Sequence, residues 1–95
     1  MSHVVCAVVE VRAVLASAGH PFVKEFPGET TLGAVKAEIL TFFGVHEETV
    51  GGNQISFSLH NRGNKLTDMS VGVGSLVENR PCKLELKVVK DIVFG

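Results

Sequence analysis

One stretch of the chain has a helical period, and it limits the folds that the remaining residues can adopt. In TTLGAVKAEILTFFG, residues 30–44, the large apolar side chains fall on a single helical stripe, which is formed by Leu32, Val35, Ile39, Leu40 and Phe43. Thr30 or Thr31 can serve as the N-cap and Gly44 suits the position after the last turn, although no capping box is present. Because one amphipathic helix needs one apolar surface to cover it, the other segments must supply a single sheet face.

The rest of the apolar sequence alternates with a period of two, which is typical of half-buried strands. The alternating segments are residues 8–16, 21–26, 54–60 and 83–89. The first two are predicted to form a hairpin around the turn SAGH. In the second, Phe22 and Phe26 point inward with Lys24 between them, so this lysine must extend to an edge, or a bulge must shift the register.

Between these strands the sequence is rich in turn-forming residues. We expect residues 45–53 to be a polar loop with a double glycine, and residues 67–81 to be irregular. Lys65 and Leu66 can form a short return strand after the turn NRGN. The element order is therefore ββαββ, an α+β fold. Its economical arrangement places the first and last strands side by side and parallel, with the helix across them, which is the β-grasp.

Composition and charge exclude several classes of protein. A net charge of −1 does not indicate the extended positive surface that nucleic-acid binding requires. With 45% hydrophobic residues, the composition is that of a globular protein. The apolar opening, residues 4–9, is far shorter than a membrane span and lacks the context of a signal peptide. We therefore expect one soluble cytoplasmic domain, residues 1–89, followed by a C-terminal tail, residues 90–95.

The two cysteines, Cys6 and Cys82, fit no zinc or redox motif. A cytoplasmic setting would keep them reduced, so buried free thiols are the favoured interpretation. Each cysteine directly precedes one of two strands that we expect to be parallel neighbours, so the two thiols can be close in space. Whether they form a disulfide then depends on the geometry between them.

No catalytic or metal site is indicated. The four histidines are scattered without metal-ligand spacing, and Gly72 and Gly74 in VGVGSLV lack the third glycine and the helix of a phosphate loop. No paired carboxylates and no nucleophile signature are present. We expect no enzyme activity, no cofactor and no metal.

Residues 11–89 resemble a ubiquitin-like domain. The resemblance is carried by PGETTLGAVKAEIL before and within the helix, by its centre VKAEI, by KLTD, and by the final strand KLELKVV. The last strand and the glycine-ended terminus are similar to the small ubiquitin-like proteins of bacterial conjugation operons, the BilA type. That resemblance implies a protein modifier in a bacterial antiphage pathway, with an activating enzyme, a conjugating enzyme, a deconjugating JAB-type protease and target proteins as partners.

In such a modifier the carboxylate of Gly95 is adenylated and then joined to an amine of the target. Glycine suits this role because it has no side chain to block a narrow channel. The apolar residues that precede it, Ile92, Val93 and Phe94, would be recognised by the enzymes. Ubiquitin and the sulfur carriers end in two glycines, whereas Phe94 is the penultimate residue here, so the cognate enzymes would need a pocket for it.

Other interpretations stay open. KDIVFG, residues 90–95, can simply extend the last strand, which would favour a non-conjugated β-grasp adaptor that binds partners along the edge of its second strand. A sulfur carrier is a weaker alternative. The outward positions of the later strands are polar, so we expect no binding by ordinary ubiquitin receptors, which use an apolar patch. The resulting polar partner face consists of Ser56, Ser58, His60, Lys83, Glu85 and Lys87.

Overall fold

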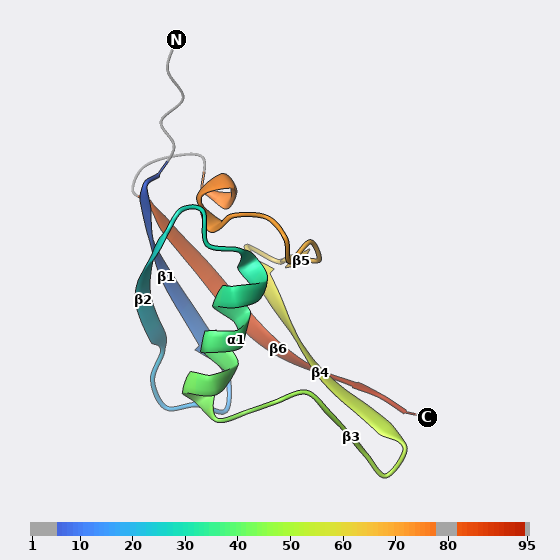
Figure 1. Cartoon of the computed structure of the whole chain (residues 1–95). Helices are drawn as coiled ribbons and strands as arrows, with labels where there is room; N and C mark the ends of the chain where they lie inside the picture. Colours follow the sequence, from blue (N-terminus) through green and yellow to red (C-terminus); the bar gives the residue numbers. More distant parts are fainter. Residues whose placement is uncertain (1–5, 78–81, 95) are drawn as a thin grey trace.

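The protein is one mixed β-sheet with a single helix across one of its faces (Figure 1). The computed structural model describes residues 6–77 and 82–94. The elements are β1 (Val8–Leu15), β2 (Phe22–Pro27), α1 (Leu32–Phe43), β3 (Glu48–Val50), β4 (Asn53–Asn61), β5 (Asn64–Leu66), the 3-10 turn η1 (Val73–Leu76) and β6 (Lys83–Val93). The strand order is β2-β1-β6-β4-β3, and β5 pairs with β4. The predicted α+β β-grasp fold is confirmed.

The first and last strands lie together at the centre of the sheet. β1 and β6 are parallel, with Glu10 opposite Lys83 and Leu15 opposite Val88, whereas the other strand pairs of the sheet are antiparallel. Parallel neighbours need a long connection between them. Here that connection contains every other element of the fold, so the pairing of β1 with β6 brings the two ends of the domain together.

The core lies between α1 and the sheet face that it covers, which we call the inner face. Alternate residues of the strands reach it, as the period of two predicted. The fully or almost fully buried members are Val9, Val11, Ala13, Phe22, Phe26, Phe57, Leu59, Leu84, Leu86 and Val88 from the strands, Leu32, Val35 and Ile39 from α1, and Val73 from η1. Leu40 and Phe43 pack against this cluster at its margin.

Both predicted ends of the helix are confirmed. The Thr31 side chain accepts a hydrogen bond from the Ala34 N–H at 3.2 Å, which makes Thr31 the N-cap. Gly44 adopts φ 70°, and its N–H closes the last turn. Lys24 shares the inner face and extends to the helix edge, where its Nζ bonds Glu38 and lies 5.3 Å from the ring centre of Phe26. The register of β1 with β2 is continuous, so no bulge is needed.

The structure adds strand where a loop and a tail were expected. Residues 48–50 of the predicted loop form β3, which pairs with β4 through a Gly51–Gly52 turn in which both φ angles are positive. β6 continues past Val89 to Val93 and stays paired with β4 over residues 54–57. The final strand is thus four residues longer than predicted.

These additions make a projecting arm that consists of β3, the β4 residues 53–57 and the β6 residues 90–93 (Figure 1). The molecule measures 54 × 26 × 21 Å, and the arm lies along its longest dimension, away from α1. Three large apolar side chains on the arm are exposed, namely Val50, Ile92 and Val93, and so is Phe94 directly after it. Among the residues that the structure describes, no helix is long and apolar enough to cross a membrane.

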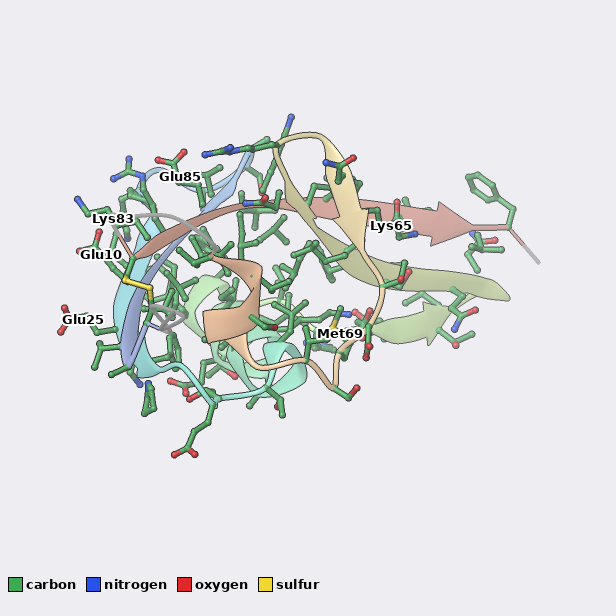
Figure 2. All side chains as sticks on the ribbon, turned by 90° about the horizontal axis from the view of Figure 1, so that it is seen from above. Glu10, Glu25, Lys65, Met69, Lys83 and Glu85 are labelled. Carbon is green, nitrogen blue, oxygen red and sulfur yellow. A yellow bond between two sulfur atoms is a disulfide. The ribbon has the colours of Figure 1, made fainter. Side chains whose placement is uncertain are left out.

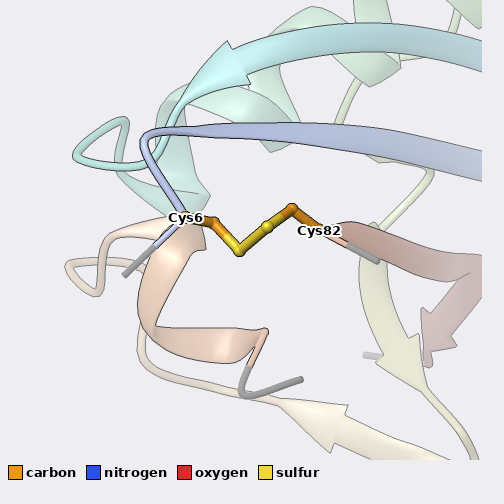
Figure 3. Close-up of a disulfide and its surroundings, with 2 residues drawn as sticks. All are labelled: Cys6 and Cys82. Atoms are coloured by element: carbon orange, nitrogen blue, oxygen red, sulfur yellow. A yellow bond between two sulfur atoms is a disulfide. The ribbon is translucent and has the colours of Figure 1, made fainter. Parts of the chain in front are cut away.

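Cys6 and Cys82 form a disulfide, so the prediction of free thiols is wrong (Figure 3). Their Cα atoms are 5.9 Å apart, although the residues are separated by 76 positions in sequence. The parallel register explains the proximity: the Glu10 N–H donates to the Cys82 carbonyl at 2.9 Å, which holds the starts of β1 and β6 side by side. The prediction was wrong because it rested on the reducing cytoplasm, whereas the register of β1 with β6 brings the two thiols together.

Gly28, Gly72 and Gly74 meet where the end of β2 crosses the segment before β6. The Gly74 N–H donates to the Gly28 carbonyl at 2.8 Å. A Cβ on Gly28 would lie 2.2 Å from the Cys6 carbonyl oxygen, and one on Gly72 would lie 2.8 Å from the Gly28 carbonyl oxygen. The VGVG sequence is therefore required by close backbone packing, which accounts for its glycines without a bound phosphate.

Removing the disulfide should leave the fold intact but weaken it. In Cys6→Ser/Cys82→Ser, the unfolded chain regains the conformational freedom that this long bridge removes, so we expect a loss of about 2–4 kcal/mol in the free energy of unfolding. Urea denaturation followed by circular dichroism measures it. If oxidised wild type and the double variant unfolded at the same urea concentration, the bridge would contribute nothing to stability.

Gly28→Ala should destabilise the protein by about 1–3 kcal/mol, because the added methyl group meets backbone that cannot move aside. Gly19→Ala is the matched control: its Cβ would meet nothing within 4 Å. We expect that variant to stay within about 0.5 kcal/mol of wild type in the same denaturation experiment. Equal stability of the two variants would show that the backbone at Gly28 is not tightly packed.

Candidate functional site

The predicted partner face lies on the sheet surface opposite α1, which we call the outer face. Leu84, Leu86 and Val88 point to the core, so the residues between them on β6 point outward. Figure 2 shows Glu10, Lys83 and Glu85 projecting away from the helix. On β4, His60 is opposite Lys87 and Ser58 is opposite Val89. The structure thus places Ser56, Ser58, His60, Lys83, Glu85 and Lys87 on one face of two adjacent strands.

These residues are not equally available to a partner. Ser58 is only 7% exposed, and its Oγ lies 3.0 Å from Nε2 of His60. The Asn61 side-chain amide donates to the Glu85 carbonyl at 2.8 Å, which ties the end of β4 to β6. Ser58 therefore belongs to the supporting structure, whereas His60 and the β6 side chains form the accessible surface.

Charge is unevenly distributed over the outer face. Across the central strand pair Glu10 is opposite Lys83 and Arg12 is opposite Glu85, so opposite charges face each other. Lys87 has Val14 opposite it on β1 and His60 opposite it on β4. Positive charge is thus balanced near the start of β6 and left in excess farther along the strand.

A hollow of about 450 Å³ lies beside Lys87 on the outer face, and we call it the outer hollow. Its lining residues are Arg12, Val14, His60, Arg62, Gly63, Glu85, Leu86, Lys87 and Val89. The sequence identified His60, Glu85 and Lys87 as surface residues but missed Arg12, Val14 and Arg62. Parity alone places Arg12 and Val14 outward, but only the register of β1 with β6 sets them beside Glu85 and Lys87.

The predicted recognition residues near the C-terminus do not lie on a free tail. Ile92 pairs with Ile55 and Val93 pairs with Gln54, and both side chains are about half exposed. Phe94 follows the strand and is 77% exposed. Gly95, the predicted conjugation terminus, lies outside the described residues.

One edge of this part of β6 is open. The parallel pairing with β1 ends where Leu15 meets Val88, whereas β4 continues to pair with β6 as far as Val93. Beyond Val88, the side of β6 that faced β1 therefore has no sheet neighbour among the described strands. Unpaired backbone donors and acceptors of this kind can bind an added strand.

Glu47 links the base of the arm to α1 through hydrogen bonds. Its carboxylate accepts hydrogen bonds from the Phe57 N–H at 2.9 Å and from Lys36 Nζ at 3.3 Å. The backbone hydrogen bond from Phe57, assisted by Lys36, lowers the pKa of Glu47. The lowered pKa of Asp68 has a similar cause, since the side chain and backbone N–H of Ser70 both donate to it. No group of three or more metal-ligating side chains occurs within residues 6–77 and 82–94.

Comparison with known proteins identifies the fold. No known protein family matches the sequence, and no curated protein matches it. Among solved structures, a ubiquitin of Caldiarchaeum subterraneum is 18% identical, with a TM-score of 0.62 over 93% of this chain and 99% of that one. ATG8 of Trypanosoma brucei is 12% identical, with a TM-score of 0.61 over 94% and 78%. A structure described as molecular mimicry of SUMO is 12% identical, with a TM-score of 0.59 over 87% and 91%. At these identities the similarity shows the fold alone, and that fold is the ubiquitin-like one.

The ionised form of Glu47 should stabilise the protein, and this contribution should be lost in acid. A lowered folded-state pKa means that the contribution is present above the unfolded pKa and falls as the pH drops through the folded value. Glu47→Gln keeps an acceptor but removes the charge. Because the carboxylate is partly solvent-screened, we expect a loss of about 1 kcal/mol or less at neutral pH. Urea titrations of both proteins at neutral and acidic pH should converge in acid; a constant difference would contradict the assignment.

Proposed function

We propose that this chain is a ubiquitin-like modifier that is joined to other proteins through the carboxylate of Gly95. An activating enzyme would transfer AMP from ATP to this carboxylate and release pyrophosphate. A cysteine thiolate would then displace AMP to form a thioester, and a target amine would displace the thiolate to form an amide. The chain itself supplies the carboxylate and the surface that the enzymes recognise, and needs no catalytic residue.

The observation that carries this proposal is the position of the C-terminal end of β6. It lies at the end of the arm, far from the helix-covered body (Figure 1). Phe94 is the most exposed of the large apolar residues that the structure describes. An enzyme can therefore approach residue 94 without meeting the body of the domain, as enclosure of a neighbouring carboxylate requires.

The pairing of residues 90–93 with β4 sets a condition on how that enzyme binds. A narrow channel that admits only a single extended chain would require β6 to separate from β4. An enzyme that instead adds its own strand to the open edge of β6 would leave the arm intact, and would contact Ile92, Val93 and Phe94 from that side. Strand addition requires less conformational change, because β6 stays paired with β4, and we include this binding mode in the proposal.

The BilA-type resemblance extends the proposal to a bacterial antiphage pathway with a conjugating enzyme and a JAB-type deconjugating protease. Adenylation consumes ATP, which places the pathway in the cytoplasm. Because the cytoplasm keeps most thiols reduced, the domain would then have to remain folded without its disulfide. This is why the stability of the Cys6→Ser/Cys82→Ser variant bears on function as well as on folding.

A non-conjugated binding module is the second candidate, and a specific feature favours it. β2 stands at one end of the strand order, so its outer edge has no neighbour among the described strands and could accept an added strand. A module of this kind would bind its partners without using Gly95. A sulfur carrier would share the adenylation step, but Phe94 in place of a second glycine counts against it.

Attachment through Gly95 can be tested in the native host with N-terminally tagged protein. Wild type should form higher-mass adducts on denaturing gels, and a protein that lacks Gly95 should form none, because the reacting carboxylate is displaced to Phe94. Mass spectrometry of the adducts should find the C-terminal peptide joined to a target amine.

Phe94→Ala is the control for this experiment, since it changes the same segment but retains the Gly95 carboxylate. It should still form some adducts. If wild type formed none while both wild type and the deletion variant captured the same partners noncovalently, the modifier proposal would fail and the binding module would replace it.

A further inference from the structure

The outer hollow combines a concave surface with an excess of positive charge. Arg12 is opposite Glu85, which balances one charge, while Lys87 and Arg62 also line the hollow. Lys87 lies across from Val14 and His60, so neither of its cross-strand neighbours is an acid. In a chain whose net charge is −1, this local excess is opposite in sign to the whole protein.

The backbone at Arg62 gives an independent reason to assign this residue a role. It adopts φ 51° in the two-residue turn that joins β4 to β5, followed by Gly63 at φ 84°. Among the described residues it is the one non-glycine residue with a positive φ. Asn or Gly would suit this position better. Arginine there is unfavourable for the turn, but it supplies a cation at the rim of the hollow.

The rest of the hollow is partly apolar. Val14 is 42% exposed, and Val89 lines the same hollow from β6. A ligand that fills this site would place an aliphatic group over the valines and negative groups toward Arg62 and Lys87. A small inorganic anion would satisfy only the second requirement.

The charges around the hollow limit the length of the ligand. Toward the start of β1, Glu10 is opposite Glu25, and farther along β6, Asp91 is opposite Ser56. All of these acids belong to the outer face. A nucleic acid strand that continued past the hollow would meet them, whereas a short acidic peptide would not.

We propose that the outer hollow binds a short acidic segment of a partner protein, with carboxylates at Arg62 and Lys87 and an aliphatic side chain over Val14 and Val89. The site lies on the sheet face and makes no use of Gly95. It therefore provides noncovalent recognition beyond the proposed conjugation, and it stands or falls separately from it.

The test is a titration of the isotopically labelled full chain, followed by NMR of its backbone amides. The probe is the acetylated and amidated peptide Glu-Glu-Val-Glu-Glu. Controls are the peptide with Gln in place of every Glu, and a short oligothymidylate. We expect the acidic peptide to shift resonances around Val14, His60, Arg62 and Lys87, and expect neither control to do so. The protein without Gly95 should bind the peptide equally well.

Three variants separate the site from general charge attraction. Lys87→Gln and Lys90→Gln make the same change on one strand but on opposite faces, since Lys90 pairs with Phe57 of the inner face. We expect Lys87→Gln and Arg62→Asn each to raise the Kd about threefold, in keeping with loss of an exposed ion pair, and Lys90→Gln to leave it unchanged. Arg62→Asn should also melt no lower than wild type, because Asn suits the turn.

Several results would overturn the proposal. An equal effect of Lys90→Gln would reduce the binding to net charge, and equal binding of the Gln peptide would remove the role of carboxylates. Tighter binding of oligothymidylate would reassign the hollow to nucleic acid. Absence of shifts on the outer face at millimolar peptide would show that the hollow does not bind acidic segments.

Discussion

The parallel pairing of β1 with β6 is the interaction on which the rest of this fold depends. It joins residues from opposite ends of the chain, so its formation closes nearly the whole sequence into one unit. The two strands supply Val9, Val11, Leu84 and Leu86 to the centre of the inner face, where α1 covers them. The same register aligns the charges of the outer face and brings Cys6 beside Cys82. Core, surface and cross-link are consequences of one alignment.

The parts of this structure that a sequence can predict are those with a local period. The helix was predictable because Leu32, Val35 and Ile39 repeat at helical spacing between a capping threonine and a glycine. The core strands were predictable because they alternate. β3 was not, since all three of its residues are exposed and show no alternation. The extension of β6 was missed because Lys90 and Asp91 interrupt the apolar pattern, and because residues 90–93 pair with β4 alone among the described strands.

The candidate site was likewise predictable only where it depends on a local pattern. Parity correctly placed Lys83, Glu85 and Lys87 on one face, because parity is a local property. The outer hollow depends on which residues of β1 and of the β4–β5 turn lie beside them, and those neighbours are set by register and by turn conformation. The fold that this chain shares with ubiquitin, SUMO mimics and ATG8 does not determine these surface residues. Function in this protein therefore has to be argued from Arg62, Lys87 and the end of β6.

The disulfide also determines how the molecule would respond to force. Tension applied between the two ends of the chain would pass from the N-terminal residues through Cys6 to Cys82, and then directly along β6. The whole segment between the cysteines, with the helix and the other five strands, lies outside this load path. Pulling on the oxidised protein would load the backbone of β6, which is already extended, and could not extend the rest of the chain. An unfoldase that pulls its substrate from one end would have to translocate two chain segments side by side at the Cys6–Cys82 cross-link, unless the disulfide were reduced first.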